Sequence, residues 1–215
     1  MVGKPSQHIG EPSLGLAEDA IATVLDLVEV GWQAACAKGE LSQSSQETEI
    51  AGRLAREMIR EKRQRKISHF RIEEEVGTRS SLSSPKPEGR IDIKIIYSFA
   101  EEEYFGIECK RVSGSRADRL SKKYVDNGVL RFVSGKYSPG HGWGAMVGFV
   151  VDGNAEAAVK LIAEVIARSK DLVCLCEDWV PEMRFGRHKH LYLTSHRQLP
   201  TSAAIRILHL FLSLN

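Results

Sequence analysis

Apolar residues recur along this chain with two different spacings, one typical of helices and one typical of strands. Spacing of three and four residues predicts helices over 16–38, from a cap at Ser45 through Ile59, and over 120–133, 155–168 and 203–214. Alternating or continuous apolar runs predict strands over 70–76, 91–97, 105–109, 143–151, 172–176 and 190–195. The chain therefore combines helices with strands, as α/β proteins do.

The stretch 89–112 carries the polar pattern with the most chemical content. Apolar residues take alternate positions and share one face in each of its two strands: Ile91, Ile93, Ile95 and Tyr97 in the first, and Phe105, Ile107 and Cys109 in the second. A hairpin that packs both apolar faces into one core brings Asp92, Glu108 and Lys110 to one polar surface. Two carboxylates and an amine there could hold a hard divalent cation and a water molecule.

Asp92, followed after a β-turn by Glu108-Cys109-Lys110, resembles the core of the PD-(D/E)XK nuclease superfamily, which has the restriction-endonuclease-like fold. Ile91 stands where the superfamily motif has proline, a common departure. The resemblance covers mainly residues 46–153. It implies an α/β fold with a central mixed β-sheet flanked by helices, built on an αβββαβ core with an N-terminal helix and C-terminal strand and helix additions.

The resemblance also implies a role for each residue of the motif. Asp92 and Glu108 are expected to bind Mg²⁺ together with the backbone carbonyl of Cys109, because hard cations prefer oxygen ligands, and Mn²⁺ is expected to substitute. The Cys109 thiol then points into the core. Lys110 is expected to orient or deprotonate the attacking water, with its pKa lowered by the nearby cation and by a partly desolvated cleft.

A further acidic residue from the preceding helix often completes such sites, and Glu49 and Glu47 are the two alternatives. Glu49 directly precedes Ile50, which starts the apolar stripe, so its side chain is expected at the edge of the buried face. Glu47 lies further out, where a carboxylate complements the helix dipole. We therefore expect Glu49 to assist catalysis and metal binding.

Basic residues gather on both sides of the motif. One group is Arg53, Arg56, Arg60, Lys62, Arg63, Arg65 and Lys66; the second is Arg111, Arg116, Arg119, Lys122 and Lys123. A phosphodiester substrate is a polyanion and would favour such flanks, whereas solvated helix faces explain the first group equally well. We expect nucleic-acid contacts from the second group and the following helix, at Arg116, Arg119, Lys122, Lys123 and Arg131.

Size and composition set broader limits. At 215 residues with a net charge of +2, the chain suits one nuclease-like domain over 14–215, preceded by a loose polar arm over 1–13. Its four cysteines are too scattered for a disulfide framework. The N-terminus has no apolar signal region, and no uninterrupted apolar segment is long enough to span a membrane. These features predict a cytoplasmic protein with reduced thiols and no membrane association.

Two simpler interpretations stay open for these motifs. Lys94 shares the face of Asp92, which also fits an amphipathic hairpin whose charges are merely solvated. Cys174 and Cys176 with His188 and His190 offer ligand types that suit zinc, but the usual two-residue spacing between cysteines is absent.

The predicted function is a Mg²⁺-dependent endonuclease that hydrolyses DNA, with RNA as an alternative substrate. The resemblance implies roles in restriction, phage defence or DNA repair, together with a homodimer or a targeting partner. One rival is a catalytically silent domain of the same fold that binds nucleic acid or a protein within a larger assembly. Another is a metal-independent adaptor that docks proteins through the acidic turn 101–103 and its basic helices.

Overall fold

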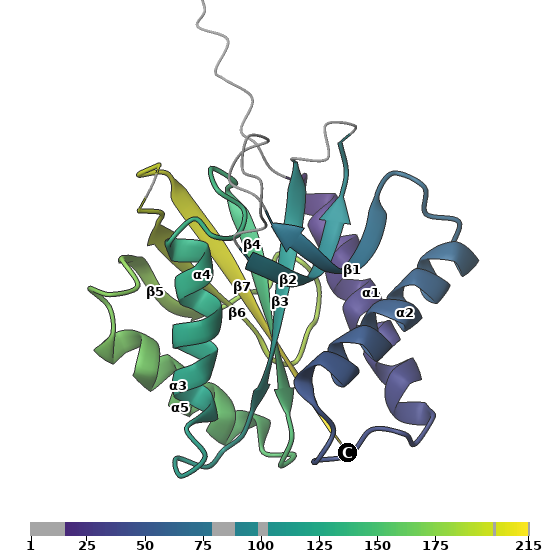
Figure 1. Ribbon diagram of the computed structural model, residues 1–215, viewed down its shortest axis with the longest axis horizontal. Helices are drawn as coiled ribbons and strands as arrows, with labels where there is room; N and C mark the ends of the chain where they lie inside the picture. Colours follow the sequence, from purple (N-terminus) through teal and green to yellow (C-terminus); the bar gives the residue numbers. More distant parts are fainter. Residues whose placement is uncertain (1–15, 79–88, 99–102, 200, 215) are drawn as a thin grey trace, which may run out of the picture.

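The computed structural model describes residues 16–78, 89–98, 103–199 and 201–214. The predicted arm over 1–13 lies outside these described residues. So do most of the predicted loop over 77–88 and most of the acidic turn 101–103. The rest of the chain forms helices packed on both faces of one sheet (Figure 1).

The described residues form five α-helices, one π-helical turn (η1) and seven strands. The helical segments are α1 (Glu18–Ala37), α2 (Glu47–Gln64), α3 (Leu120–Tyr124), η1 (Val125–Val129), α4 (Leu130–Val133) and α5 (Ala155–Arg168). The strands are β1 (Arg71–Thr78), β2 (Gly89–Ile96), β3 (Tyr104–Val112), β4 (Trp143–Val150), β5 (Leu175–Pro181), β6 (Leu191–Arg197) and β7 (Ala204–Ser213). The predicted order of helix, three strands, helix and strand is confirmed.

The sheet has the strand order β1-β2-β3-β4-β7-β6-β5 and is mixed, as predicted. Strands β3, β4 and β7 run parallel to one another at its centre, and the remaining neighbours pair antiparallel. Every residue of β4 is buried, because helices cover both faces of a parallel centre. The continuous apolar run that predicted this strand has the same physical cause.

Each face of the sheet has its own hydrophobic core. Helices α1 and α2 cover one face, where their apolar stripes pack on alternate residues of β3, β4 and β7. The helical segments α3, η1, α4 and α5 cover the other face and pack on the intervening residues of the same strands. Figure 1 shows α1 and α2 on the right and α3, α4 and α5 on the left, so the sheet is the middle layer.

The predicted C-terminal helix over 203–214 is wrong, because this segment is strand β7. It pairs with β4 from Trp143↔Arg206 to Val150↔Ser213 and with β6 on its other side. A central strand is apolar on both faces, and a short run of this kind has no period that separates strand from helix. The packing between β4 and β6 therefore decides the conformation.

Two smaller predictions are also wrong. The strand predicted over 172–176 begins only at Leu175, because Cys174 has a φ of +47° that ends the preceding turn outside extended geometry. Ser45 does not cap α2: its hydroxyl accepts a hydrogen bond from Ser42 N at 3.1 Å, and Gln46 occupies the cap position.

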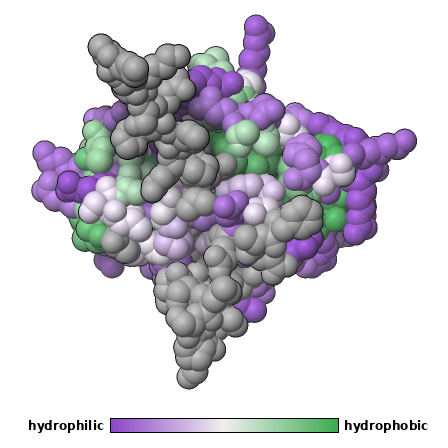
Figure 2. All heavy atoms as spheres, turned by 90° about the horizontal axis from the view of Figure 1, so that it is seen from above, coloured by the Kyte–Doolittle hydropathy of each residue, from purple (hydrophilic) through white to green (hydrophobic). Residues whose placement is uncertain are grey.

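Helix α1 is the one described helix whose length and composition would allow it to cross a membrane. Half of its most apolar stretch is buried inside the fold, where Ile21, Val24 and Leu25 have no exposed surface. The apolarity of α1 is therefore that of a core helix, which fits a soluble protein. Seen from above, hydrophilic residues form much of the outer rim, with smaller apolar areas between them (Figure 2).

Two buried histidines beneath α3 form one chain of hydrogen bonds. His196 Nδ1 lies 2.8 Å from the carbonyl of Val173, so this nitrogen donates and His196 Nε2 accepts from Thr194 Oγ1 at 2.7 Å. His209 Nε2 then donates to Thr194 Oγ1 at 2.8 Å, and His209 Nδ1 accepts from Tyr124 at 2.9 Å. Both imidazoles are neutral in this arrangement, since each has one donor and one acceptor nitrogen.

We expect this network to make the fold acid-sensitive. Burial lowers the pKa of His196 to about 4, so between pH 6.5 and 4 only the unfolded chain binds this proton and stability is lost as the pH falls. The free energy of unfolding of the parent should fall by about 1.4 kcal/mol more per pH unit than that of His196→Gln in this range. Urea denaturation at several pH values measures both slopes. The variant His69→Gln, which changes an exposed histidine, should keep the parent slope; equal slopes in all three proteins would contradict the prediction.

Candidate active site

The predicted polar surface exists and lies under the helical segments α3, η1 and α4. Glu108 and Lys110 point from β3 to this face, and both are almost completely buried, with 1% and 8% of their surface exposed. The thiol of Cys109 points to the opposite face, into the core with α1 and α2, as the alternation of a strand requires. The predicted parity of β3 is therefore confirmed.

Strand β2 departs from regular pairing at Asp92. Its pairing with β1 passes from Ile93 directly to Ile91, so Asp92 and the opposite residue Glu75 are not paired, and Glu75 has a φ of +49°. The pairing of β2 with β3 ends at Ile93↔Ile107. The Asp92 carboxylate instead accepts the backbone N–H of Cys109 at 2.7 Å. The register of β1 and β2 is the same on both sides of the missing pair, so this is a local break in the pairing and not a bulge. The prediction that Ile91 shares the face of Ile93 is wrong for the same reason, since Ile91 packs in the core under α3.

Lys110 is the centre of the cluster. Its ammonium group lies 2.8 Å from Glu108 Oε1, 2.8 Å from Glu47 Oε1 and 2.7 Å from the carbonyl oxygen of Cys109. These three groups come from two elements, β3 and the first residue of α2. The Lys110 ammonium group therefore links Glu47, at the start of α2, to Glu108 in the central strand β3.

The helix residue at the site is Glu47, and the prediction that Glu49 would join the cluster is wrong. Glu47 accepts hydrogen bonds through both oxygens, from Lys110 Nζ and from the backbone N–H of Arg111 at 3.0 Å. Glu49 instead pairs with Arg53 one turn along α2, at 3.2 Å, with its side chain 44% exposed. The end of β3 meets α2 at its first residue, so the carboxylate at the helix start reaches the strand.

Arg131 reaches the same carboxylates from α4. Its guanidinium lies 3.2 Å from Glu108 Oε1 and donates to the hydroxyl of Tyr137, which in turn donates to the carbonyl of Arg90. The sequence gives no signal for Tyr137, because it stands in a Gly- and Ser-rich turn and touches the site only through the fold. Arg131 is one-third exposed and is the predicted nucleic-acid contact that lies at the cluster.

The close approach of the covering helix depends on Gly128 in η1. A Cβ at this position would lie 2.3 Å from Met146 Cε on β4 and 3.7 Å from Lys110 Cγ. A π-turn is uncommon and occurs often at functional sites. Here it lowers the helix onto the sheet directly over Lys110.

Burial and like charge dominate the electrostatics of the two carboxyl groups. Burial raises the pKa of Asp92, and burial together with the charge of Asp92 raises the pKa of Glu108 to about 7. For Lys110, burial favours the neutral amine, but the charges of Glu108, Asp92 and Glu47 outweigh it and raise the pKa above its usual range. The protein groups alone thus keep Lys110 protonated, so the fall in its pKa expected from the sequence would need a bound cation.

The cluster presents oxygen atoms of the type that hard divalent cations prefer. Glu108 Oε2 is buried and has no hydrogen-bond partner among the described residues. Burial also makes the charged form of the Asp92 and Glu108 carboxyl groups unfavourable. An ion that prefers oxygen ligands would satisfy Glu108 Oε2 together with Asp92 and the Cys109 carbonyl. With Lys110 placed between the acids, no group of three His, Cys, Asp or Glu side chains within the described ranges is arranged to hold a metal. The four residues of the zinc alternative, Cys174, Cys176, His188 and His190, are all described and form no such group, so that alternative is wrong.

The remaining predicted nucleic-acid contacts lie away from the cluster. Arg116 pairs with Glu164 of α5 at 2.6 Å, and Lys122 pairs with Asp126. Arg119 and Lys123 are exposed at the start of α3. The structure therefore separates Arg131, at the cluster, from the basic residues on the outer side of the covering helix.

Comparison of the chain with protein-family models, with curated proteins and with solved structures finds no match. The family resemblance therefore depends on the residues themselves and on their arrangement. These are an acid from an irregular β2, Glu108 and Lys110 on one face of β3, and an acid from the preceding helix.

Proposed function

We propose that this chain is a metal-dependent nuclease of the PD-(D/E)XK type that hydrolyses phosphodiester bonds in DNA. One observation carries the proposal: Asp92, Glu108 and Lys110 converge on one face, and no described residue partners the buried Glu108 Oε2, which a cation would satisfy. Charges that serve only solubility would stay in contact with water. Burying a charged group loses more hydration energy than one ion pair returns, so such burial points to a function.

Each residue has a physical role in this proposal. Asp92, Glu108 and the Cys109 carbonyl would hold Mg²⁺ or Mn²⁺, which supplies charge neutralisation at the phosphate and a more acidic water. Lys110 would orient the water and hold or accept its proton, while Glu47 positions the Lys110 ammonium at 2.8 Å. The Arg131 guanidinium contacts Glu108 at the proposed metal site and is partly exposed, so it could also bind a phosphate oxygen there.

The direct test is cleavage of circular, linear and single-stranded DNA, with RNA in parallel, by the folded full chain. We expect cleavage with Mg²⁺ or Mn²⁺ and none in EDTA, because the carboxylates cannot polarise a phosphate without a cation. Gel electrophoresis over time measures the rates and shows the substrate form. A folded protein that cuts none of these substrates with either metal would contradict the proposal and favour the silent binding domain.

Glu47 and Glu49 form a matched pair that tests the assignment of the helix acid. Glu47→Gln should lower the cleavage rate by about tenfold to a hundredfold, because it loosens the Lys110 ammonium without removing a metal-binding carboxylate. Glu49→Gln, which changes the same side chain two residues away, should leave the rate unchanged. The rates at saturating metal decide the matter; equal loss in both variants would contradict the role of Glu47.

We further propose that the protein works in the cytoplasm. Cys36, Cys109, Cys174 and Cys176 are all free, as a reducing compartment would keep them. Roles in restriction, phage defence or repair, and a homodimer or targeting partner, stay predictions.

A further inference from the structure

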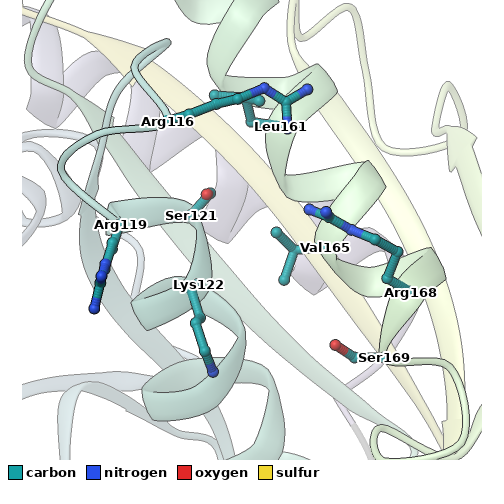
Figure 3. Close-up of a pocket in the computed structure, with 8 residues that line it drawn as sticks. All are labelled: Arg116, Arg119, Ser121, Lys122, Leu161, Val165, Arg168 and Ser169. Carbon is teal, nitrogen blue, oxygen red and sulfur yellow. The ribbon is translucent and has the colours of Figure 1, made fainter.

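A pocket lies on the outer side of α3, away from the carboxylate cluster. It has a volume of about 330 Å³. It lies between α5 on one side and α3, with the connection before α3, on the other. Figure 3 shows Arg116 reaching across from this connection and Arg168 pointing from α5 into the space between the helices, with Ser121 on the facing side, on α3. Ser169 borders the same space at the end of α5.

Cations outnumber acids around this pocket. Arg116, Arg119, Lys122 and Arg168 all line it, but no carboxylate does. Nearby acids neutralise two of these cations, Glu164 pairing with Arg116 and Asp126 with Lys122. Within the described part of the chain, Arg119 and Arg168 form no salt bridge. The excess of two positive charges matches a phosphate monoester, which carries close to two negative charges at neutral pH.

Ser121 supplies a neutral hydrogen-bonding group at this pocket. The residue is 8% exposed and its hydroxyl borders the cavity. A serine hydroxyl can donate one hydrogen bond, so it could bind a ligand oxygen there.

The remaining wall of the pocket is apolar. Leu161 and Val165 form it, on the same helix α5 as Arg168. A site with one charged end and one apolar wall suits a ligand that combines a phosphate with a flat, weakly polar part. The volume is at the lower end of ligand pockets, which fits one nucleotide rather than a larger cofactor.

We propose that this pocket binds the phosphate of a single nucleotide, either free or at the end of a nucleic-acid strand. Arg168 holds the phosphate oxygens, Ser121 donates its hydroxyl, and the nucleoside lies against Leu161 and Val165. This site needs no metal and shares no residue with the carboxylate cluster. It therefore stands or falls independently of the proposed cleavage.

Isothermal titration calorimetry of the full chain in EDTA tests the proposal, with inorganic phosphate, dAMP and a short oligonucleotide with or without a 5′-phosphate as probes. EDTA removes cleavage from the experiment. We expect dAMP to bind the parent, and Arg168→Ser to weaken this binding at least about tenfold, because a bidentate arginine contact is lost. Arg63→Ser, which removes another exposed arginine, near the end of α2, should leave the affinity unchanged.

The strand and the free nucleotide are distinguished by the oligonucleotide. Tighter binding of the 5′-phosphorylated strand than of both dAMP and the 5′-hydroxyl strand supports a strand end, whereas no gain over dAMP supports a free nucleotide. The proposal is overturned if neither phosphate nor dAMP binds, or if Arg168→Ser binds them as the parent does. Ser121→Ala is a second, milder variant whose affinity should also fall, and both variants should melt cooperatively as a check of folding.

Discussion

Replacing Asp92 by alanine is expected to reduce metal-dependent DNA cleavage by at least about a thousandfold, because metal stabilisation of the transition state supplies several kcal/mol. Asp92 is the acid that the irregular end of β2 aims at the cluster, and its neighbour Glu108 alone leaves a bound cation one carboxylate short. Initial rates with Mg²⁺ and Mn²⁺ measure the loss. Mn²⁺ should restore little of it, since the missing ligand is the same for both ions.

Asp171→Ala is the matched control, because it removes an exposed carboxylate from the loop before β5. Its cleavage rate should equal that of the parent. A thermal melt separates lost chemistry from lost folding in Asp92→Ala, which trades a desolvated carboxylate for an unpaired Cys109 N–H. A folded Asp92→Ala protein that cuts at the parent rate would remove Asp92 from the active site.

Strand periodicity was enough to predict the centre of the candidate site. Side chains alternate strictly along β3, so the pattern of Phe105, Ile107 and Cys109 determines where Glu108 and Lys110 point. That inference needs only local geometry. It also explains why the parity of β2 was predicted less well, since the irregularity at Asp92 comes from pairing with β1 and β3.

The helix acid and the C-terminal strand could not be decided locally. Glu47 and Glu49 both belong to the first turn of α2, and only the docking of that turn against the end of β3 selects Glu47. The segment 204–213 is apolar without a clear period, and its pairing between β4 and β6 makes it a strand. In both cases a contact distant in sequence overrides a weak local preference.

Replacing Lys110 by methionine is expected to destabilise the fold strongly even without metal. The Lys110 side chain is 9% exposed, and its ammonium group is the charged partner shared by Glu108 and Glu47. Removing one partner of a buried ion pair leaves an uncompensated buried charge, at a cost of about 3–5 kcal/mol. Urea denaturation in EDTA at pH 7.5 should show a loss of this size. Lys122→Met, which removes a lysine that is 65% exposed, should lose less than about 1 kcal/mol.

The double variant Lys110→Met, Glu108→Gln shows whether buried charge is the cause. Glutamine keeps the size of Glu108 but carries no charge, so the double variant should regain much of the stability that Lys110→Met loses. If the double variant is no more stable than Lys110→Met, the loss comes from packing against Gly128 and Met146. Recovery would mean that Lys110 stabilises the fold by compensating the buried carboxylates of Asp92 and Glu108. Stability alone would not favour two buried carboxylates side by side, whereas a cation-binding site requires them.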